Sequence, residues 1–276
     1  MKYRIILAML LFAAPILKAQ TSVDLDSDLG GRIAFSLDKK LVKGLHLAFE
    51  EEVRVDDGFT SLNRLQSTIG LTYKVNRYLK VGLGYVMINP YNSDSSAFKN
   101  IRHRFMADVT GSLAFGVWRI SLKERFQATC RTGDINEYQA PRTALALKSR
   151  LKLQYRGFRQ FVPYASVELR NTLNAPVIKA AYNETTGKWV SQETGFAKNE
   201  AGWFLDGFDG VYINRWRGAI GAEYKIDKKS SIDVSFLADF VNDKVVDANA
   251  EGTKLKSYTQ EKGFVGWFTA GYTIMF

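Results

Sequence analysis

The sequence predicts an all-β protein: one antiparallel transmembrane β-barrel, with short periplasmic turns and longer extracellular loops. Three features support this fold class. The chain of 276 residues ends on an aromatic strand, apolar and polar residues alternate along most of its length, and no stretch after the amino terminus is apolar for long enough to form a transmembrane helix. A closed barrel is the other fold that satisfies its backbone polar groups in lipid.

The carboxyl-terminal segment 264–276, FVGWFTAGYTIMF, carries no charged side chain. Taken with a period of two, one of its faces is apolar and aromatic, and the other is mixed. A strand that ends on an exposed Phe resembles the closing strand of bacterial outer-membrane barrels. The barrel assembly machinery recognises that strand. We therefore expect an assembly signal at Phe268, Tyr272, Ile274 and Phe276, with an ordinary core strand as the alternative.

The amino terminus predicts a secretory signal peptide at residues 1–19. Lys2 and Arg4 precede the nearly uniform apolar run 5–17, and Leu17-Lys18-Ala19 is a suitable cleavage site. This run is too short for a membrane-spanning helix, which needs about twenty residues, so a membrane anchor is the weaker alternative. We expect the mature chain in the bacterial outer membrane, with a polar leader at 20–30 and a single barrel at 31–276.

Alternation of apolar and polar residues begins at Gly31 and defines eleven segments of about ten residues each. The expected strands are 31–38, 45–55, 64–75, 79–87, 101–109, 118–128, 145–155, 165–170, 215–226, 232–240 and 264–276. Tight turns alternate with longer connections between these strands. A soluble β-sandwich would scatter its turn lengths instead, so the pattern favours a membrane barrel.

The strand count raises a parity problem, because eleven antiparallel strands leave the two termini at opposite ends of a barrel. We therefore expect the leader to add a strand near 23–29 or to thread the lumen. Twelve strands is the preferred count, in a range of ten to twelve. Two polar segments, 174–212 and 242–262, are expected to be large external loops, and NETTG at 183–187 predicts a hairpin turn in the first.

The predicted lumen face is rich in cations. Thirteen basic residues fall there: Arg54, Arg64, Arg102, Arg104, Arg119, Lys123, Arg125, Lys148, Arg150, Lys152, Arg170, Arg215 and Arg217. Seven acidic residues share this face: Glu50, Glu52, Asp108, Glu168, Glu223, Asp233 and Asp239. The excess predicts a positive lumen, in line with a net charge of +10. It indicates a porin-like narrow channel or a binding barrel for small anionic solutes; an ion-paired plug is the alternative.

Two acidic residues fall on the lipid face instead. Glu51 is expected near the rim, and Glu124 is expected to mark a bulge or a register slip. Outer-membrane lipid, including lipopolysaccharide with its phosphates, is an expected partner of the barrel. Nucleic acid is not, because a secreted chain seldom meets it.

Barrel enzymes that modify lipids need a serine and a histidine within hydrogen-bond reach. Only His46 and His103 are present, and His103 falls on the lipid side with no serine two residues away. Cys130 is the only cysteine, and no cluster of carboxylates or histidines suits a metal. We therefore expect no enzyme activity, no catalytic residues, no metal and no cofactor. A lipid-modifying enzyme is the third hypothesis.

Several segments together resemble the DUF2490 family of outer-membrane barrels, found largely in Bacteroidetes. They are ISLKERFQATCR, ALKSRLKLQY, FVPYASVELRNTL and WRGAIGAEYKIDKKSSIDVSF, with LDKKLVKGLHLAFEEEVRV and IGLTYKVNRYLKVGLGYV upstream. The resemblance covers essentially the whole mature chain. It implies an outer-membrane barrel and no particular activity. The second functional hypothesis, of a different class from the channel, is a closed structural barrel or a surface-interaction barrel that acts through the 174–212 loop.

Overall fold

The computed structural model describes residues 26–176, 179–183, 188–193, 196–199, 202–205, 208–250 and 255–276. The expected signal peptide and the first part of the leader lie outside these residues. No helix in the described part of the chain is long and apolar enough to span a membrane.

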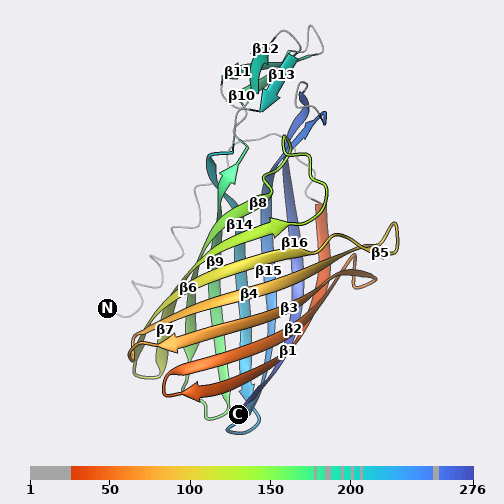
Figure 1. Ribbon diagram of the computed structural model, residues 1–276. Helices are drawn as coiled ribbons and strands as arrows, with labels where there is room; N and C mark the ends of the chain where they lie inside the picture. Colours follow the sequence, from red (N-terminus) through yellow and green to blue (C-terminus); the bar gives the residue numbers. More distant parts are fainter. Residues whose placement is uncertain are drawn as a thin grey trace.

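The described chain consists of β-strands joined by turns and loops (Figure 1). The strands are β1 (Asp26–Val42), β2 (Leu45–Asp56), β3 (Ser61–Lys74), β4 (Leu79–Asn92), β5 (Ala97–Phe98), β6 (Arg102–Phe115), β7 (Trp118–Arg131), β8 (Thr143–Tyr155), β9 (Phe161–Ala175), β10 (Lys179–Asn183), β11 (Lys188–Glu193), β12 (Phe196–Asn199), β13 (Gly202–Leu205), β14 (Gly210–Lys225), β15 (Ser230–Ala248) and β16 (Leu255–Met275). All eleven strands expected from the alternation are present.

A closed barrel forms because the strands pair in the order β3-β2-β1-β16-β15-β14-β9-β8-β7-β6-β4, and β4 pairs again with β3. β5 pairs only with β4 and lies outside this ring, so the barrel has eleven strands. This number lies within the expected range and is one below the preferred twelve. The leader adds no twelfth strand; its residues from Asp26 onward are the start of β1.

The odd strand number is accommodated at one parallel seam. β1 pairs with β16 in parallel, from Asp26 opposite Gly263 to Asp38 opposite Met275, whereas the other neighbours in the barrel are antiparallel. Both strands therefore start at the same end of the barrel. The parity argument assumed that every pair of neighbouring strands is antiparallel. The parallel pair β1–β16 does not meet this assumption, so an odd number of strands can close the barrel.

The two ends of the barrel differ. At one end, which we call the turn end, residues 43–44, 75–78, 116–117, 156–160 and 226–229 connect the strands. Gly44 and Gly116 adopt the positive φ that two-residue hairpin turns require. At the other end, the loop end, the connections include 93–101, 132–142 and 176–209. This difference in length agrees with the expected pattern.

The prediction of a loop at 242–262 is wrong. β15 continues to Ala248 and β16 begins at Leu255, and the two pair from Asn242 opposite Lys262 to Ala248 opposite Leu255. Polar residues on both faces suit a strand pair that extends into water, so composition alone could not distinguish it from a loop. NETTG is flanked by β10 and β11, which pair in antiparallel order with Asn183 opposite Lys188, as a hairpin there requires. Residues 184–187 themselves lie outside the described residues.

The barrel is apolar outside and polar inside. Ile33, Leu83 and Ile220 leave 69%, 66% and 65% of their surfaces exposed on the outer face, while Gln66 and Asp239 expose only 4% and 2%. This distribution is the reverse of that in a soluble protein. It follows from alternation, because successive residues of each strand point to opposite faces.

The two acidic residues of the outer face lie within regular strands. Glu124 pairs in register with Val109 of β6 and Ser149 of β8, so the expected bulge is absent. Glu51 lies in the middle of β2, opposite Phe35 and Ser67, and not at the rim. Each carboxylate accepts a hydrogen bond from a serine of the next strand: Ser149 donates to Glu124 at 2.6 Å, and Ser67 donates to Glu51 at 2.9 Å. These bonds are compatible with regular strand pairing, so the register is kept.

Candidate functional site: the basic lumen

The structure places all thirteen predicted basic residues on the inner face of the barrel, because each alternates with outward apolar residues of its strand. They come from β2, β3, β6, β7, β8, β9 and β14. Six of them form ion pairs with carboxylates: Arg54, Lys123, Arg125, Lys148, Arg215 and Arg217. The lumen thus contains a paired set and an unpaired set of cations.

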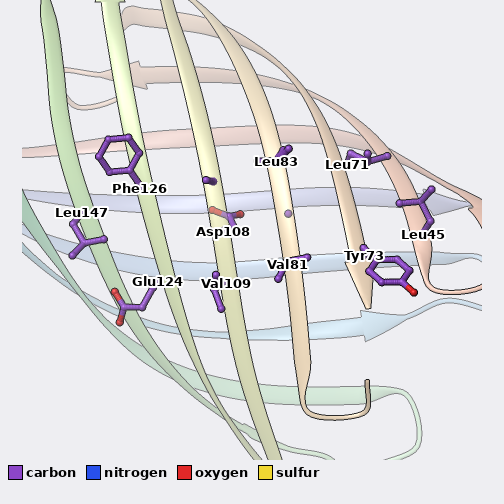
Figure 2. Close-up of a pocket in the computed structure, with 12 residues that line it drawn as sticks. Leu45, Leu71, Tyr73, Val81, Leu83, Asp108, Val109, Glu124, Phe126 and Leu147 are labelled. Carbon is purple, nitrogen blue, oxygen red and sulfur yellow. The ribbon is translucent and has the colours of Figure 1, made fainter. Parts of the chain in front are cut away.

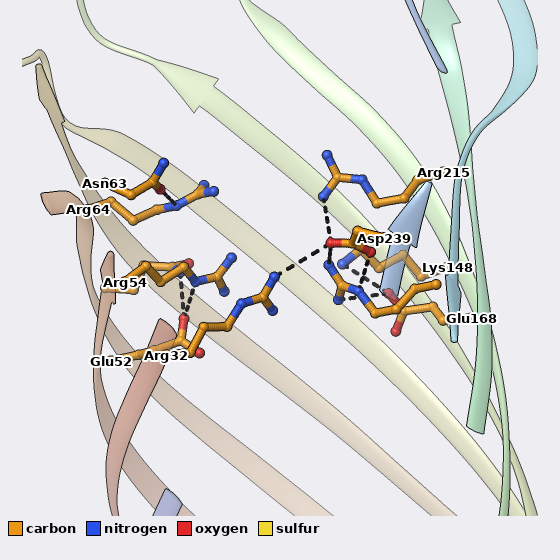
Figure 3. A network of polar contacts seen from close by, with 11 residues as sticks. Arg32, Glu52, Arg54, Asn63, Arg64, Lys148, Glu168, Arg215 and Asp239 are labelled. Carbon is orange, nitrogen blue, oxygen red and sulfur yellow. Dashed lines mark hydrogen bonds and ion pairs between the residues drawn. The ribbon is translucent and has the colours of Figure 1, made fainter. Parts of the chain in front are cut away.

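A chain of ion pairs follows the inner wall from β8 to β15 (Figure 3). Lys148 lies 3.5 Å from Glu168, and Glu168 lies 3.4 Å from Arg217. Arg217 then forms a bidentate pair with Asp239, with hydrogen bonds of 2.6 and 2.7 Å. Bidentate pairing fixes both planes, so this part of the wall is rigid.

Asp239 is the centre of this network. Its carboxylate also lies 3.5 Å from Arg32 of β1 and 3.9 Å from Arg215. Three guanidinium groups therefore surround one carboxylate that is almost completely buried. Asp239 was expected in the lumen, but its three partners come from two different strands and could not be assigned from alternation alone.

Two lumen residues extend the set found from the sequence. Arg32 is 7% exposed and lies over the indole ring of Trp267, 4.3 Å from its centroid. Trp267 is 6% exposed, and its Nε1 has no hydrogen-bond partner in the described structure; neither has Nε of Arg32. Arg32 lies on the polar face of β1, and Trp267 lies on the mixed face of β16. The sequence therefore indicated that both could face the lumen, but the predicted set of thirteen basic residues did not include them.

Two smaller clusters complete the paired set. Arg54 donates to Glu52 at 2.5 Å, and Gln66 donates to the same carboxylate oxygen at 2.8 Å. Across the barrel, Asp108 accepts from Arg125 at 2.6 Å and lies 2.7 Å from Lys123. The Gln66–Glu52 bond and the two Asp108 contacts join neighbouring strands, as an ion-paired plug would, whereas Arg54 and Glu52 belong to the same strand.

Seven of the predicted cations form no ion pair with a carboxylate of the described chain: Arg64, Arg102, Arg104, Arg119, Arg150, Lys152 and Arg170. Neutral groups orient some of them. Arg64 donates to Asn63 at 2.7 Å, Arg104 to Thr129 at 3.0 Å, and Lys152 lies over the ring of Tyr164. No carboxylate of the described chain lies within ion-pair distance of these seven cations.

Four guanidinium groups form what we call the arginine ring: Arg64 of β3, Arg104 of β6, Arg170 of β9 and Arg215 of β14. Each interacts electrostatically with the next around the lumen, and Arg215 with Arg64 again. Asp239 pairs with Arg215, and Asp243 lies close enough to Arg170 to attract it. The remaining repulsion would be relieved by a bound anion.

A cavity of about 350 Å³ lies in the lumen beside this ring, a volume typical of small-ligand sites. Its charged lining consists of Arg54, Arg104, Arg125, Lys148, Arg150, Arg217, Glu50, Glu52 and Glu168. The lining is mixed, with more cations than carboxylates. It could hold an anion that also offers hydroxyl or amino groups.

The loop 132–142 lies over the loop end of the lumen. Asn136 donates to the carbonyl oxygens of Ala248 and Asn249 at 3.0 and 3.1 Å, and Gln139 donates to Asp247 at 2.6 Å. Cavities of about 390 and 500 Å³ flank the loop, and Arg131 lines both. Access from this end passes beside further cations.

The histidines take part in local pairs. His103 lies on the outer face, where its Nδ1 is 2.6 Å from the hydroxyl of Tyr85, and His46 lies 2.7 Å from Asp38 inside the turn end. Neither has a serine partner among its described hydrogen bonds. The described residues contain no group of three or more His, Cys, Asp or Glu side chains placed to hold a metal ion.

Comparison with known proteins places this barrel in a family. No curated protein matches the sequence. The family model described as "Protein of unknown function (DUF2490)" matches residues 33–249, which extend from β1 to the end of β15. The match covers well over half of the chain, and the chain therefore belongs to the DUF2490 family.

Proposed function

We propose that this protein is an outer-membrane β-barrel that admits small anionic solutes to its lumen and binds them at the arginine ring. The apolar outer face supports the membrane placement, since contiguous exposed apolar surface of this kind marks contact with lipid. Aromatic residues at the turn end also support it: Trp118, Tyr155 and Phe158 contact one another edge to face, with ring centroids 4.9 and 5.2 Å apart. Such girdles lie at membrane interfaces.

The observation that carries the proposal is the lack of carboxylate partners for Arg64 and Arg104 within the described structure. Buried cations are normally paired, because removing a charge from water is costly. A barrel that needed only a rigid plug would neutralise these two groups as it neutralises Arg217. Arg104 lines the cavity of about 350 Å³, and Arg64 lies within electrostatic reach of Arg104. Cations placed in this way without a carboxylate partner are the arrangement expected when the missing charge belongs to a solute.

The alternative is a closed barrel with a structural or surface-interaction role. The ion pairs from Lys148 to Asp239 favour it, because they narrow the lumen. The side chains of most of the 174–212 loop lie outside the described residues, so the loop adds no argument. A lipid-modifying enzyme has no support from the histidine contacts.

The test is single-channel recording of the refolded mature protein in a planar bilayer under a salt gradient. Anion-selective conductance is expected, and replacing Arg102 and Arg104 together by Gln should move the reversal potential toward zero. Arg142→Gln is the matched control, because Arg142 is exposed on the loop 132–142 and pairs with Glu137. Unchanged selectivity in the double variant would contradict the proposal.

If the folded barrel shows no conductance, binding of anions is measured directly. In that case thermal unfolding in detergent, with sulfate replacing chloride at constant ionic strength, reports on a site for divalent anions. A binding barrel gains stability with sulfate, and the double variant does not. A barrel that neither conducts nor responds to sulfate is closed and structural.

A further inference from the structure

A second candidate site lies on the outer face of the barrel, away from the lumen. It is a groove of about 480 Å³ that crosses the strands from β2 to β8 (Figure 2). We call it the outer groove. One of its walls is a row of side chains that are direct neighbours across the sheet: Leu71, Leu83, Ala107, Phe126 and Leu147.

The other wall is the next row toward the turn end. It consists of Tyr73, Val81, Val109 and Glu124, again direct neighbours across the sheet. The groove is hollow between the rows because Ala107 and the valines are short, whereas Tyr73 and Phe126 stand higher at its two sides. Its lining is almost wholly apolar, and Glu124 is the one outward-facing charged side chain among its described lining residues.

Glu124 lies deep in the apolar band. It is six residues from Trp118, which belongs to the aromatic group at the turn end. At about 3.3 Å per residue and a strand tilt of 35–45°, that separation is about 15 Å along the barrel axis. An ionisable residue at such a depth is costly in lipid and indicates a functional partner.

The hydrogen bonding of Glu124 shows what that partner must supply. Ser149 donates to Oε2 at 2.6 Å, and Oε1 has no partner among the described contacts. Asp108 also lines the groove, but its carboxylate is bound inside the barrel by Lys123 and Arg125. Oε1 of Glu124 is therefore available to accept a hydrogen bond from an occupant of the groove.

We infer that the outer groove binds an acyl chain of a membrane lipid that carries a hydroxyl group along its length, with Glu124 accepting the hydroxyl hydrogen bond. A chain fits the elongated apolar walls. A hydroxyl is a neutral donor, so it avoids the desolvation that a cation would suffer at this depth, and a carboxyl oxygen can accept its hydrogen bond. The inference shares only the membrane placement with the proposed function; it does not depend on the lumen.

The protein contains a matched control for this site. Glu51 also faces outward and also accepts a hydrogen bond from a serine, Ser67, but it lies outside the groove. Replacement of either glutamate by Leu gives a side chain that suits a lipid-facing position, so both variants should fold. Only Glu124→Leu removes the acceptor from the groove.

The experiment uses two probe lipids, phosphatidylcholines with either a 12-hydroxystearoyl or a stearoyl chain. They are present in equal, small amounts in phosphatidylcholine vesicles that hold the refolded protein. After extraction into detergent, mass spectrometry measures the ratio of the two probes retained by the protein. We expect a preference of about tenfold for the hydroxylated chain, which corresponds to about 1.4 kcal/mol for one additional hydrogen bond.

Glu124→Leu should bring the ratio to about one, and Glu51→Leu should leave it unchanged. Ala107→Leu, which fills the hollow between the rows, should also abolish the preference. Equal retention of both probes by the natural protein would overturn the inference, as would an equal loss in Glu51→Leu. Glu124-dependent crosslinking of two copies in the vesicles would show that protein occupies the groove instead. Sulfate stabilisation, measured on the same preparations, reports separately on the lumen.

Discussion

The amide nitrogen of Lys40 in β1 donates a hydrogen bond of 3.0 Å to the carbonyl oxygen of Phe276, the last residue of the chain. The amide of Phe276 in turn donates to the carbonyl oxygen of Asp38, also at 3.0 Å. The carboxyl-terminal residue is therefore bonded into the first strand, at the point where the parallel seam ends. Closure of the barrel therefore depends on the pairing of β16 with β1.

Deletion of Phe276 should slow barrel closure and lower the yield of folded protein. Two backbone hydrogen bonds are lost at the seam, worth about 2 kcal/mol together. The measurement is the fraction of heat-modifiable protein on electrophoresis after refolding into detergent. Phe276→Tyr keeps both bonds and the ring, so it should refold like the natural protein. If the deletion variant refolds equally well, pairing along the rest of β16 closes the barrel without its last residue.

Gly30→Ala should prevent the seam from forming. A Cβ atom at Gly30 would lie 2.7 Å from the indole of Trp267 and would also collide with the backbone oxygen of Val55. Backbone cannot move aside cheaply in a paired strand. Gly271→Ala is the control on the opposite side of the seam, since nothing lies within 4 Å of its Cβ. The yield of folded protein should be much lower for Gly30→Ala than for Gly271→Ala. Similar yields would show that β1 can shift to accommodate the methyl group.

Asp239→Asn should destabilise the barrel by about 3–5 kcal/mol, because it leaves Arg32, Arg215 and Arg217 buried without their shared charge partner. Urea unfolding of the refolded protein in detergent measures the change. Glu137→Gln breaks the exposed pair with Arg142 and should cost less than about 1 kcal/mol. A small effect at Asp239 would mean that water reaches the network and solvates the arginines.

The turn between β14 and β15 should become less stable in acid. Asp227 accepts hydrogen bonds from the amides of Lys229 and Ser230 at 2.6 and 2.7 Å, and these bonds lower the pKa of its carboxyl from the ordinary 3.8. Since the folded pKa is lowered, the stabilisation is fully present above the unfolded pKa and is lost as the pH falls through the folded pKa.

Amide hydrogen exchange at Lys229 and Ser230, corrected for the intrinsic pH dependence, measures this effect. Protection should fall in the natural protein as the pH drops below about 4. Asp227→Asn keeps an acceptor oxygen without the charge, so its protection should be lower at neutral pH and independent of pH in this range. The same pH dependence in both proteins would assign the effect to another group.

The sequence by itself determined the strands and their two faces. Alternation with a period of two is a local property, so it located all eleven strands, and it assigned the thirteen basic residues to the face opposite the exposed apolar side chains. The fold class followed from the same alternation, whereas the family was indicated by the resemblance of particular segments to DUF2490 and shown by the family-model match. The one loop placed wrongly, 242–262, is polar on both faces, and a polar hairpin in water has the same composition as a loop.

Only the tertiary structure decided the parallel pairing of β1 with β16 and the choice of partners inside the lumen. Asp239 reaches Arg32, two strands away, and leaves Arg104 unpaired; nothing local to either arginine distinguishes them. The outer groove depends in the same way on rows that cross several strands. Such distances are set by how the sheet closes, which is a property of all the strands together and not of any one segment.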